Sequence, residues 1–175
     1  MRTPVSLFLL TATLAACSYP DPRGGAPMPL IGANGQSVGT VTAYQTAGGA
    51  TFRIEASGLP HGVHGIHVHA VGRCDPADFK SAGAHWNPAN RKHGTSNPAG
   101  PHAGDLPNVT VAANGVLSTT VTVAGADVSG PGGLLDGDGA ALVLHAAADD
   151  YMTDPSGNSG DRIACAVLAP TNVRY

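Results

Sequence analysis

The segment Gly65-Ile66-His67-Val68-His69-Ala70 decides how this chain of 175 residues is interpreted. Its apolar residues alternate with His67 and His69, and a period of two predicts a short β-strand within Val63 to Ala70. Side chains two residues apart on a strand share one face, so we expect both imidazoles to point the same way. A rigid strand is a good support for metal ligands, and the segment therefore predicts one side of a metal site.

A long stretch without helical or strand periodicity follows, from about Gly72 to Pro107. The segment from His61 to Asp105 holds seven of the eight histidines, and His145 is the eighth. A loop of this length inside a compact domain is expected only where it is functional or clamped. Metal ligands and a disulfide bond would clamp it. The potential ligands that it carries are His85, His93, His102 and Asp105.

The rest of the chain predicts an all-β domain over residues 30–175. Turn signals at Asn34-Gly35 and Asn114-Gly115 separate short alternating segments, and no helical pattern occurs. A second long loop covers Ala146 to Asp161. We therefore expect an eight-stranded Greek-key β-sandwich or flattened barrel with two long functional loops. Besides the histidine-bearing strand, the expected strands are Ser37–Gln45, Ala50–Ser57, Val109–Ala112, Val116–Val123, Ala140–His145 and Arg162–Leu168.

The N-terminus has the features of an export signal. An apolar run from Val5 to Ala16 is too short to span a bilayer, and it ends at Cys17. Leu14-Ala15-Ala16-Cys17 resembles the lipobox of bacterial lipoproteins, in which the cysteine is acylated after cleavage. Residues 1–16 are thus expected to be a signal peptide, and residues 17–29, rich in Pro and Gly, a tether to the membrane. The alternative is an ordinary signal peptide cut nearby, which Leu14 at the −3 position disfavours. Either way, we expect a protein of the periplasm or cell envelope.

The charge and the cysteine content indicate which partners and which cellular compartment to expect. The chain has no basic run, which argues against a nucleic-acid partner. If Cys17 carries lipid, Cys74 and Cys165 remain as an even number in an oxidising compartment. A bridge between them would contribute about 4–5 kcal/mol at most. The alternative, two buried free thiols, is disfavoured by export.

The histidines and Asp105 are too numerous for one metal ion, because zinc takes four ligands. One set comes from strands and is nitrogen-only, which favours Cu(II): His67, His69 and His145. The other set comes from the loop and mixes nitrogen with oxygen, which suits zinc: His93, His102 and Asp105. His85 lies between the sets in sequence and could serve both, because an imidazolate has two nitrogens. The alternative, surface or hydrogen-bonded histidines, could account for one or two of them.

Several motifs together resemble the copper-zinc superoxide dismutases, in that family's order, from about Leu30 to Leu168. The Pro101-His102-Ala103-Gly104-Asp105 context, the short second loop and the lipobox resemble the exported bacterial branch. The motifs are Gly65-Ile66-His67-Val68-His69, Gly83-Ala84-His85-Trp86-Asn87-Pro88, Arg91-Lys92-His93-Gly94, Gly104-Asp105-Leu106, Leu142-Val143-Leu144-His145 and Gly160-Asp161-Arg162-Ile163-Ala164-Cys165.

The resemblance implies one copper and one zinc per chain. Copper would be held by His67, His69, His85 and His145. Zinc would be held by His85, His93, His102 and Asp105, so that His85 bridges the two. Arg162 matches the arginine that orients the anion over copper, and Asp149 matches a carboxylate linking His67 to His93. Cys74 and Cys165 match the intrachain disulfide. The family occurs as monomers and dimers, so a homodimer is compatible with the resemblance.

The activity implied is the dismutation of superoxide to dioxygen and hydrogen peroxide by a copper redox cycle, with His85 carrying a proton. The alternative is a catalytically silent relative that binds copper and zinc, and Arg162 argues against it. The mature chain has eight Lys and Arg against twelve acids, a net −4 once Arg2 is removed with residues 1–16. A local positive path must therefore attract superoxide. Ala146 to Asp161 has no Lys or Arg, so we expect a path built differently from that of the animal enzymes. Candidates besides Arg162 are Lys80, Arg91 and Lys92.

The remaining conspicuous residues are expected to be structural. His64 should pack beside the copper strand, and His61 should lie on the surface. Phe79 and Trp86 should pack the loop.

Overall fold

The structure is a computed structural model and describes residues 25–129, 133–135 and 137–168. They form nine β-strands and one turn of 3-10 helix, η1 (Lys80–Ala82). Within these residues no helix is long and apolar enough to cross a membrane. The strands are β1 (Met28–Gly32), β2 (Ser37–Thr46), β3 (Gly49–Ala56), β4 (Gly62–His64), β5 (Ile66–His69), β6 (Val109–Val111), β7 (Leu117–Ala124), β8 (Ala140–His145) and β9 (Arg162–Leu168).

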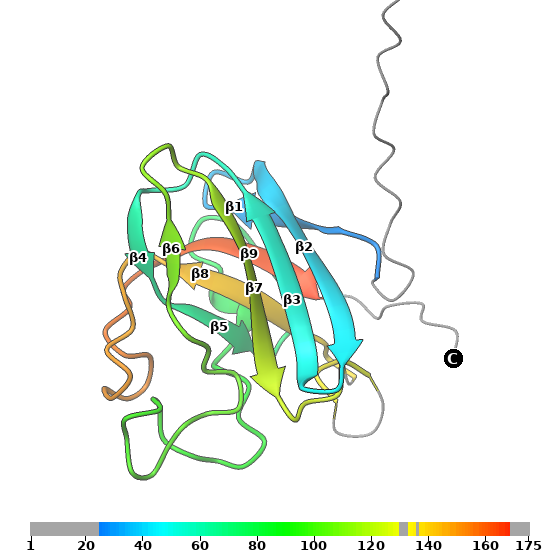
Figure 1. The fold of residues 1–175 in the computed structure, drawn as a ribbon, viewed down its shortest axis with the longest axis vertical. Helices are drawn as coiled ribbons and strands as arrows, with labels where there is room; N and C mark the ends of the chain where they lie inside the picture. Colours follow the sequence, from blue (N-terminus) through cyan, green and yellow to red (C-terminus); the bar gives the residue numbers. More distant parts are fainter. Residues whose placement is uncertain (1–24, 130–132, 136, 169–175) are drawn as a thin grey trace, which may run out of the picture.

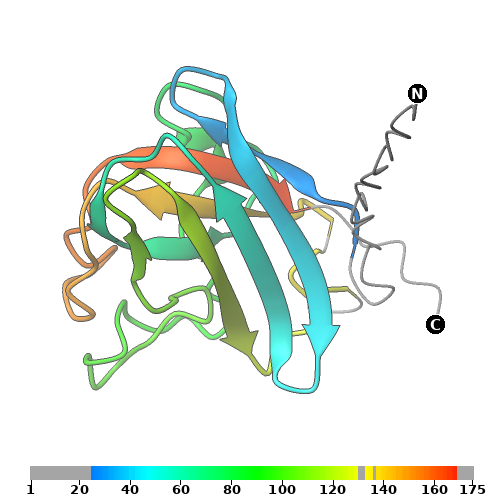
Figure 2. The same ribbon diagram turned by 45° about the horizontal axis from the view of Figure 1, so that its top comes forward.

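Seven of the strands form one antiparallel sheet in the order β5-β8-β9-β1-β2-β3-β7, and β4 pairs with β6 in a second, small sheet. The large sheet curls so that β2, β3 and β7 face β9, β8 and β5 across the interior (Figures 1 and 2). The interior is a single apolar core that includes Val41, Phe52, Ile54, Leu117 and Leu142. The expected all-β flattened barrel is therefore confirmed.

The histidine-bearing strand differs from the prediction of one strand over Val63 to Ala70. The chain breaks at Gly65, so that β4 joins β6 while β5 joins β8. A Cβ at residue 65 would lie 2.9 Å from the Cβ of Ser159 in the second loop. The glycine thus lets the second loop pack closely where the chain changes sheets.

Two further features differ from the expectation, although both strands around Asn114-Gly115 form within one residue of their expected bounds, as β6 and β7. The turn at Asn114-Gly115 forms, with Ala112 N donating to Val116 O at 2.9 Å. The strands on either side then separate, because β6 pairs with β4 and β7 with β3. Strand β1 begins at Met28, so the last two residues of the predicted tether belong to the sheet. This strand was not predicted because it contains Pro29, and proline is rare in β-sheets. In the structure the side chain of Pro29 is exposed.

The later part of residues 70–108 and residues 146–161 lie on the same side of the molecule (Figures 1 and 2). We call residues 70–108 the first loop and residues 146–161 the second loop. The first loop is fixed to the barrel by the disulfide bond between Cys74 and Cys165 of β9, whose Cα atoms are 5.7 Å apart. The two loops cover the face of β5 that carries its histidines.

Candidate metal centre

Strands β5 and β8 bring the first histidines together. They pair antiparallel with Ile66 opposite Leu144, which places His145, the last residue of β8, beside the start of β5. The ring centroids of His67 and His145 are 4.8 Å apart. All four residues of β5 are buried, because Ile66 and Val68 enter the core while the loops cover His67 and His69. The strand thus presents two imidazoles to one buried space, as its alternation predicts.

His85 reaches the same space from the first loop. It forms an isolated β-bridge with His69, and its ring stacks on that of His67 with centroids 4.0 Å apart. Four imidazole nitrogens here are buried and have no hydrogen-bond partner within the described residues. These atoms are His67 Nδ1, His69 Nε2, His85 Nε2 and His145 Nε2.

Each of these four rings has its other nitrogen engaged. His67 Nε2 bonds Asp149 Oδ2 at 2.8 Å, and His69 Nδ1 donates to the carbonyl of Gly83 at 2.9 Å. His145 Nδ1 donates to the carbonyl of Gly160 at 3.2 Å. A hydrogen bond at one nitrogen fixes the tautomer and leaves the other as a lone-pair donor. An unpaired buried polar atom is costly, and four of them converging is the arrangement expected of metal ligands.

A second set gathers around one oxygen of Asp105. Its Oδ1 lies 2.8 Å from His85 Nδ1, 3.0 Å from His93 Nδ1 and 3.3 Å from His102 Nδ1. The Nδ1 atoms of His85 and His102 are 3.4 Å apart. A tetrahedral zinc site with bonds of about 2.0 Å has ligand atoms about 3.3 Å apart, so these four atoms fit one zinc ion. Asp105 Oδ2 accepts from the backbone N–H groups of Gly94 and His102, which fixes the carboxylate.

His85 belongs to both sets. Its Nε2 is among the four unpartnered nitrogens, and its Nδ1 faces Asp105. By distance alone, ligand atoms of His67 also lie within 4.8 Å of those of His85, His93 and Asp105. The hydrogen bond from His67 Nε2 to Asp149 decides between the sets, because it leaves only Nδ1 free. His67 therefore belongs with the nitrogen-only set.

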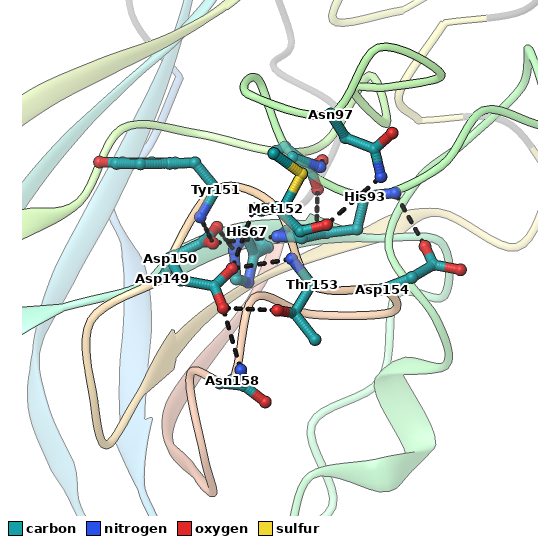
Figure 3. A network of polar contacts seen from close by, with 12 residues as sticks. His67, His93, Asn97, Asp149, Asp150, Tyr151, Met152, Thr153, Asp154 and Asn158 are labelled. Atoms are coloured by element: carbon teal, nitrogen blue, oxygen red, sulfur yellow. Dashed lines mark hydrogen bonds and ion pairs between the residues drawn. The ribbon is translucent and has the colours of Figure 1, made fainter.

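Asp149 links the two sets from the second loop. Its carboxylate bonds His67 Nε2 at 2.8 Å and His93 Nε2 at 3.0 Å, and all three side chains are fully buried. Figure 3 shows Asp149 among these rings and the residues that follow it in the loop. Asn108 holds the backbone of Asp149 through two hydrogen bonds of 2.8 and 2.9 Å. Neighbouring Asp150 instead closes a turn within the loop, accepting from Met152, Thr153 and Asn158.

Asp154 fastens the second loop to the first. Its carboxylate accepts from the backbone N–H of His93 at 2.8 Å (Figure 3). It also pairs with Lys92 Nζ at 2.9 Å. We did not predict this role, nor that of Asn108, because a polar residue in a loop has no periodic pattern that would reveal its partner. For the same reason, the sequence did not predict that the backbone carbonyl of Gly83 accepts hydrogen bonds from His69 and Arg162.

The protonation of the metal-free cluster follows from burial and from the carboxylates. Burial lowers the pKa of His69 to about 2, and those of His85 and His145 to about 4. Burial also opposes the charged form of His93, but its hydrogen bonds to Asp105 and Asp149 outweigh that and raise its pKa to about 9. Most of the nitrogen-only set is thus neutral at pH 7, which is the state that binds a metal.

Arg162 stands at the opening of this cluster. It lines a cleft of about 850 Å³ together with His69, His85 and His145. Its Nη1 donates to the carbonyl of Phe79 at 2.7 Å and its Nη2 to that of Gly83 at 2.8 Å. Burial lowers its pKa, yet an arginine remains charged at neutral pH. Because Gly83 O also accepts from His69, one carbonyl positions both the cation and a potential ligand.

The other conspicuous residues are structural. His64 is buried and bonds the carbonyls of His145 and Pro60, whereas His61 is exposed. Phe79 is fully buried beside Cys165, and Trp86 packs against the main core.

A curled β-barrel that holds a buried histidine cluster, divided into two ligand sets around one shared imidazole, defines a metalloprotein with a two-metal site. The profile of the copper/zinc superoxide dismutase (SODC) family matches residues 37–168. The chain belongs to this family. It is therefore an oxidoreductase that acts on superoxide, with copper and zinc as its metals.

Named relatives agree with this assignment. Copper-zinc superoxide dismutase 1 of Aquifex aeolicus is 42% identical over 145 residues, covering 79% of this chain and 84% of the relative. The superoxide dismutase-like protein YojM of Bacillus subtilis is 37% identical over 193 residues, with 98% of both chains covered. Among solved structures, a SOD-like protein from Bacillus subtilis has a TM-score of 0.79 at 39% identity, covering 83% of this chain and 99% of that one. The Cu/Zn superoxide dismutase from Brucella abortus has a TM-score of 0.66 at 28% identity, with 83% and 99% covered.

Proposed function

We propose that this chain dismutes superoxide with copper held by the four unpartnered nitrogens and zinc held by the set around Asp105. The copper ligands are His67 Nδ1, His69 Nε2, His85 Nε2 and His145 Nε2. The zinc ligands are His85 Nδ1, His93 Nδ1, His102 Nδ1 and Asp105 Oδ1. The observation that carries the proposal is His85, whose two ring nitrogens face the two different sets.

The reaction consumes two superoxide anions and two protons and yields one dioxygen and one hydrogen peroxide. Bound copper supplies the one-electron redox change, which zinc cannot. The chain itself supplies binding, orientation and protons. Arg162 presents a fixed guanidinium to the cleft, where it can hold an anion beside His69 and His145. His85 lines the same cleft and can carry a proton to the departing peroxide.

The alternative, a silent metal-binding relative, has less support. A protein that only stores metal needs no cation over an accessible metal face, whereas Arg162 is held there by two carbonyls. The family membership also favours the enzyme.

The assignment is tested by metal analysis together with inhibition of cytochrome c reduction by superoxide. We expect wild type loaded with copper and zinc to be active. His145→Ala should lose copper and activity while keeping zinc, and Asp105→Ala should lose zinc first. His61→Ala, an exposed histidine outside both sets, is the matched control and should keep both metals. Loaded wild-type protein without activity would exclude the dismutase function.

The proposal includes export and a lipid anchor at Cys17. Residues 1–24 lie outside the described residues, so the support comes from the sequence of the apolar run and lipobox, and from the Cys74–Cys165 disulfide, which suits an oxidising compartment. We propose cleavage before Cys17, a tether that ends where β1 begins at Met28, and a location in the periplasm or cell envelope. Mass spectrometry of the mature N-terminus should find an acylated cysteine, and Cys17→Ser should move the protein from the membrane to the soluble fraction.

A homodimer is a further part of the proposal and rests on the family resemblance alone. Sedimentation equilibrium of the mature protein tests it: a mass of two chains supports the dimer, and a mass of one chain excludes it.

A further inference from the structure

The positive charges of the described residues are distributed unevenly. Of six Lys and Arg side chains there, four form ion pairs with a carboxylate: Arg53–Glu55, Arg73–Asp75, Lys80–Asp78 and Lys92–Asp154. Arg91 and Arg162 are the two without a carboxylate partner within the described residues. Both line the cleft together with His69, His85 and His145, which carry three of the four unpartnered imidazole nitrogens. The cations that are free to attract an anion therefore lie where superoxide must enter.

The surroundings of Arg162 are close to neutral overall. A neighbouring pocket is lined by Arg162 and Lys80 together with Asp78 and Asp161, so two cations stand against two carboxylates. The only carboxylate among the residues that line the cleft is Asp154, and it is paired with Lys92 at 2.9 Å. Arg91 is then the one cation lining the cleft, besides Arg162, that has no carboxylate partner among the described residues.

Arg91 is held in place by its neighbours. The side chain of Asn87 accepts from Arg91 N at 2.9 Å and donates to Arg91 O at 2.9 Å, which locks the backbone. Arg91 Nη2 donates to the carbonyl of Gly100 at 3.0 Å. The guanidinium is exposed but anchored at one end, so its remaining N–H groups stay beside the cleft.

We propose that Arg91 is the second fixed positive charge of the anion path, in place of a cation in the second loop. That loop, residues 146–161, contains no Lys or Arg but four Asp. Arg91 draws superoxide toward the cleft and Arg162 orients it at the metal. This inference rests on the proposed function, because it assigns Arg91 to the substrate path of the same site.

The expected effect of Arg91 is modest because its side chain is exposed. One charge acting across several ångströms of water at low salt changes an encounter rate by about twofold, and screening removes most of this at high salt. Arg91→Gln should therefore lower kcat/KM about twofold at an ionic strength of roughly 0.02 M, and Arg91→Glu about fourfold. Arg91→Lys should restore the rate, because it keeps the charge without the guanidinium.

The experiment measures kcat/KM of the copper- and zinc-loaded protein by pulse radiolysis at several ionic strengths. The matched control is Arg53→Gln, which removes the same charge from β3, away from the cleft. The proposal predicts that the rate of wild type falls as ionic strength rises, and that Arg91→Gln flattens this dependence while Arg53→Gln does not. Equal rates and equal salt dependence of Arg91→Gln and Arg53→Gln would overturn it.

Azide binding to the copper-loaded protein provides a measurement that does not depend on turnover. Azide is a small monoanion, and its absorption with copper reports its dissociation constant. The constant should rise about twofold in Arg91→Gln at low salt and stay unchanged in Arg53→Gln. An inactive wild type with Arg91-dependent azide binding would reject the proposed function but keep the inference. An active wild type in which Arg91→Gln alters neither azide binding nor rate would keep the proposed function but reject the inference about Arg91.

Discussion

At His85 a single ring connects the two halves of the site. Its position follows from the first loop, where the bridge to His69 fixes the backbone and Asp105 engages Nδ1. Asp149, which belongs to neither ligand set, likewise fixes the rings of His67 and His93 through hydrogen bonds to their Nε2 atoms. The affinity for each metal therefore depends also on residues such as Asp149, which bind no metal themselves but orient the imidazole rings that do.

Replacing Asp149 tests this dependence. Asp149→Asn places an amide N–H group near ring nitrogens that now donate to a carboxylate, and we expect the affinity for both metals to fall about 10- to 100-fold. Competition with chelators measures the affinities. Asp150→Asn is the control, because its carboxylate bonds only groups of the second loop. Equal losses in the two variants would contradict the role given to Asp149.

The second loop is the element that sets the positions of Asp149 and Asp154. Gly157 has a φ of 63°, and a Cβ there would collide with Asp149 Oδ1 and lie 2.8 Å from His93 Nε2. A glycine is needed at this position both for the backbone conformation and for the space. The loop therefore folds tightly over the ligands instead of lying as a separate surface segment.

Gly157→Ala should consequently weaken zinc binding as well as stability. Gly58→Ala separates the effect of backbone strain from that of the collision with Asp149, since Gly58 has a φ of 73° but open space at its Cβ. We expect Gly58→Ala to cost about 1–2 kcal/mol of stability, with metal affinity unchanged. Urea unfolding and chelator competition measure the two quantities. If both variants bind zinc as wild type does, the contact between Gly157 and Asp149 has no role in the site.

The first loop depends on its disulfide. Cys74→Ser with Cys165→Ser opens a link between residues 91 apart in the chain. We expect the free energy of unfolding of the metal-free protein to fall by about 2–5 kcal/mol, because the unfolded chain gains conformational freedom. Urea unfolding of oxidised wild type and of the double variant gives the difference. A loss below about 1 kcal/mol would show that the bond does not restrict the unfolded chain as supposed.

At the scale of the whole molecule, the fold buries several histidines whose pKa values are shifted from that of a free histidine. In the metal-free protein, His69, His85 and His145 have pKa values lowered from 6.5 to about 2, 4 and 4. Below pH 6.5 the unfolded chain binds more protons than the folded one, so stability falls as the pH falls. His93, raised to about 9, keeps an extra proton in the folded state, and that stabilisation is lost as the pH rises from 6.5 through 9.

Thermal unfolding of the metal-free protein should therefore show its highest midpoint near pH 6.5. The decline should be steeper toward pH 4.5, where four histidines act because burial lowers the pKa of His67 as well, than toward pH 9, where one acts. His93→Gln should abolish the decline on the alkaline side only. A midpoint in wild type that rises between pH 6.5 and 9 would contradict the raised pKa of His93.

The sequence was sufficient for the fold class, for six strands within one or two residues and for the residues that gather at the site. These features have local periodicity, or belong to motifs such as Gly83-Ala84-His85. It was not sufficient for the break at Gly65, for β1 or for the separation of β6 from β7, because these depend on which strand pairs with which. The contributions of Asn108, Asp154 and the Gly83 carbonyl depend on contacts between distant segments, and no local pattern encodes them.

The central claim is that one imidazole joins two metal ions. The most direct measurement is anomalous X-ray diffraction from crystals of the loaded protein at the copper and zinc absorption edges. We expect a copper peak among His67 Nδ1, His69 Nε2 and His145 Nε2, and a zinc peak beside Asp105 Oδ1, with His85 between the two. A missing peak, or either metal bound away from His85, would contradict the account.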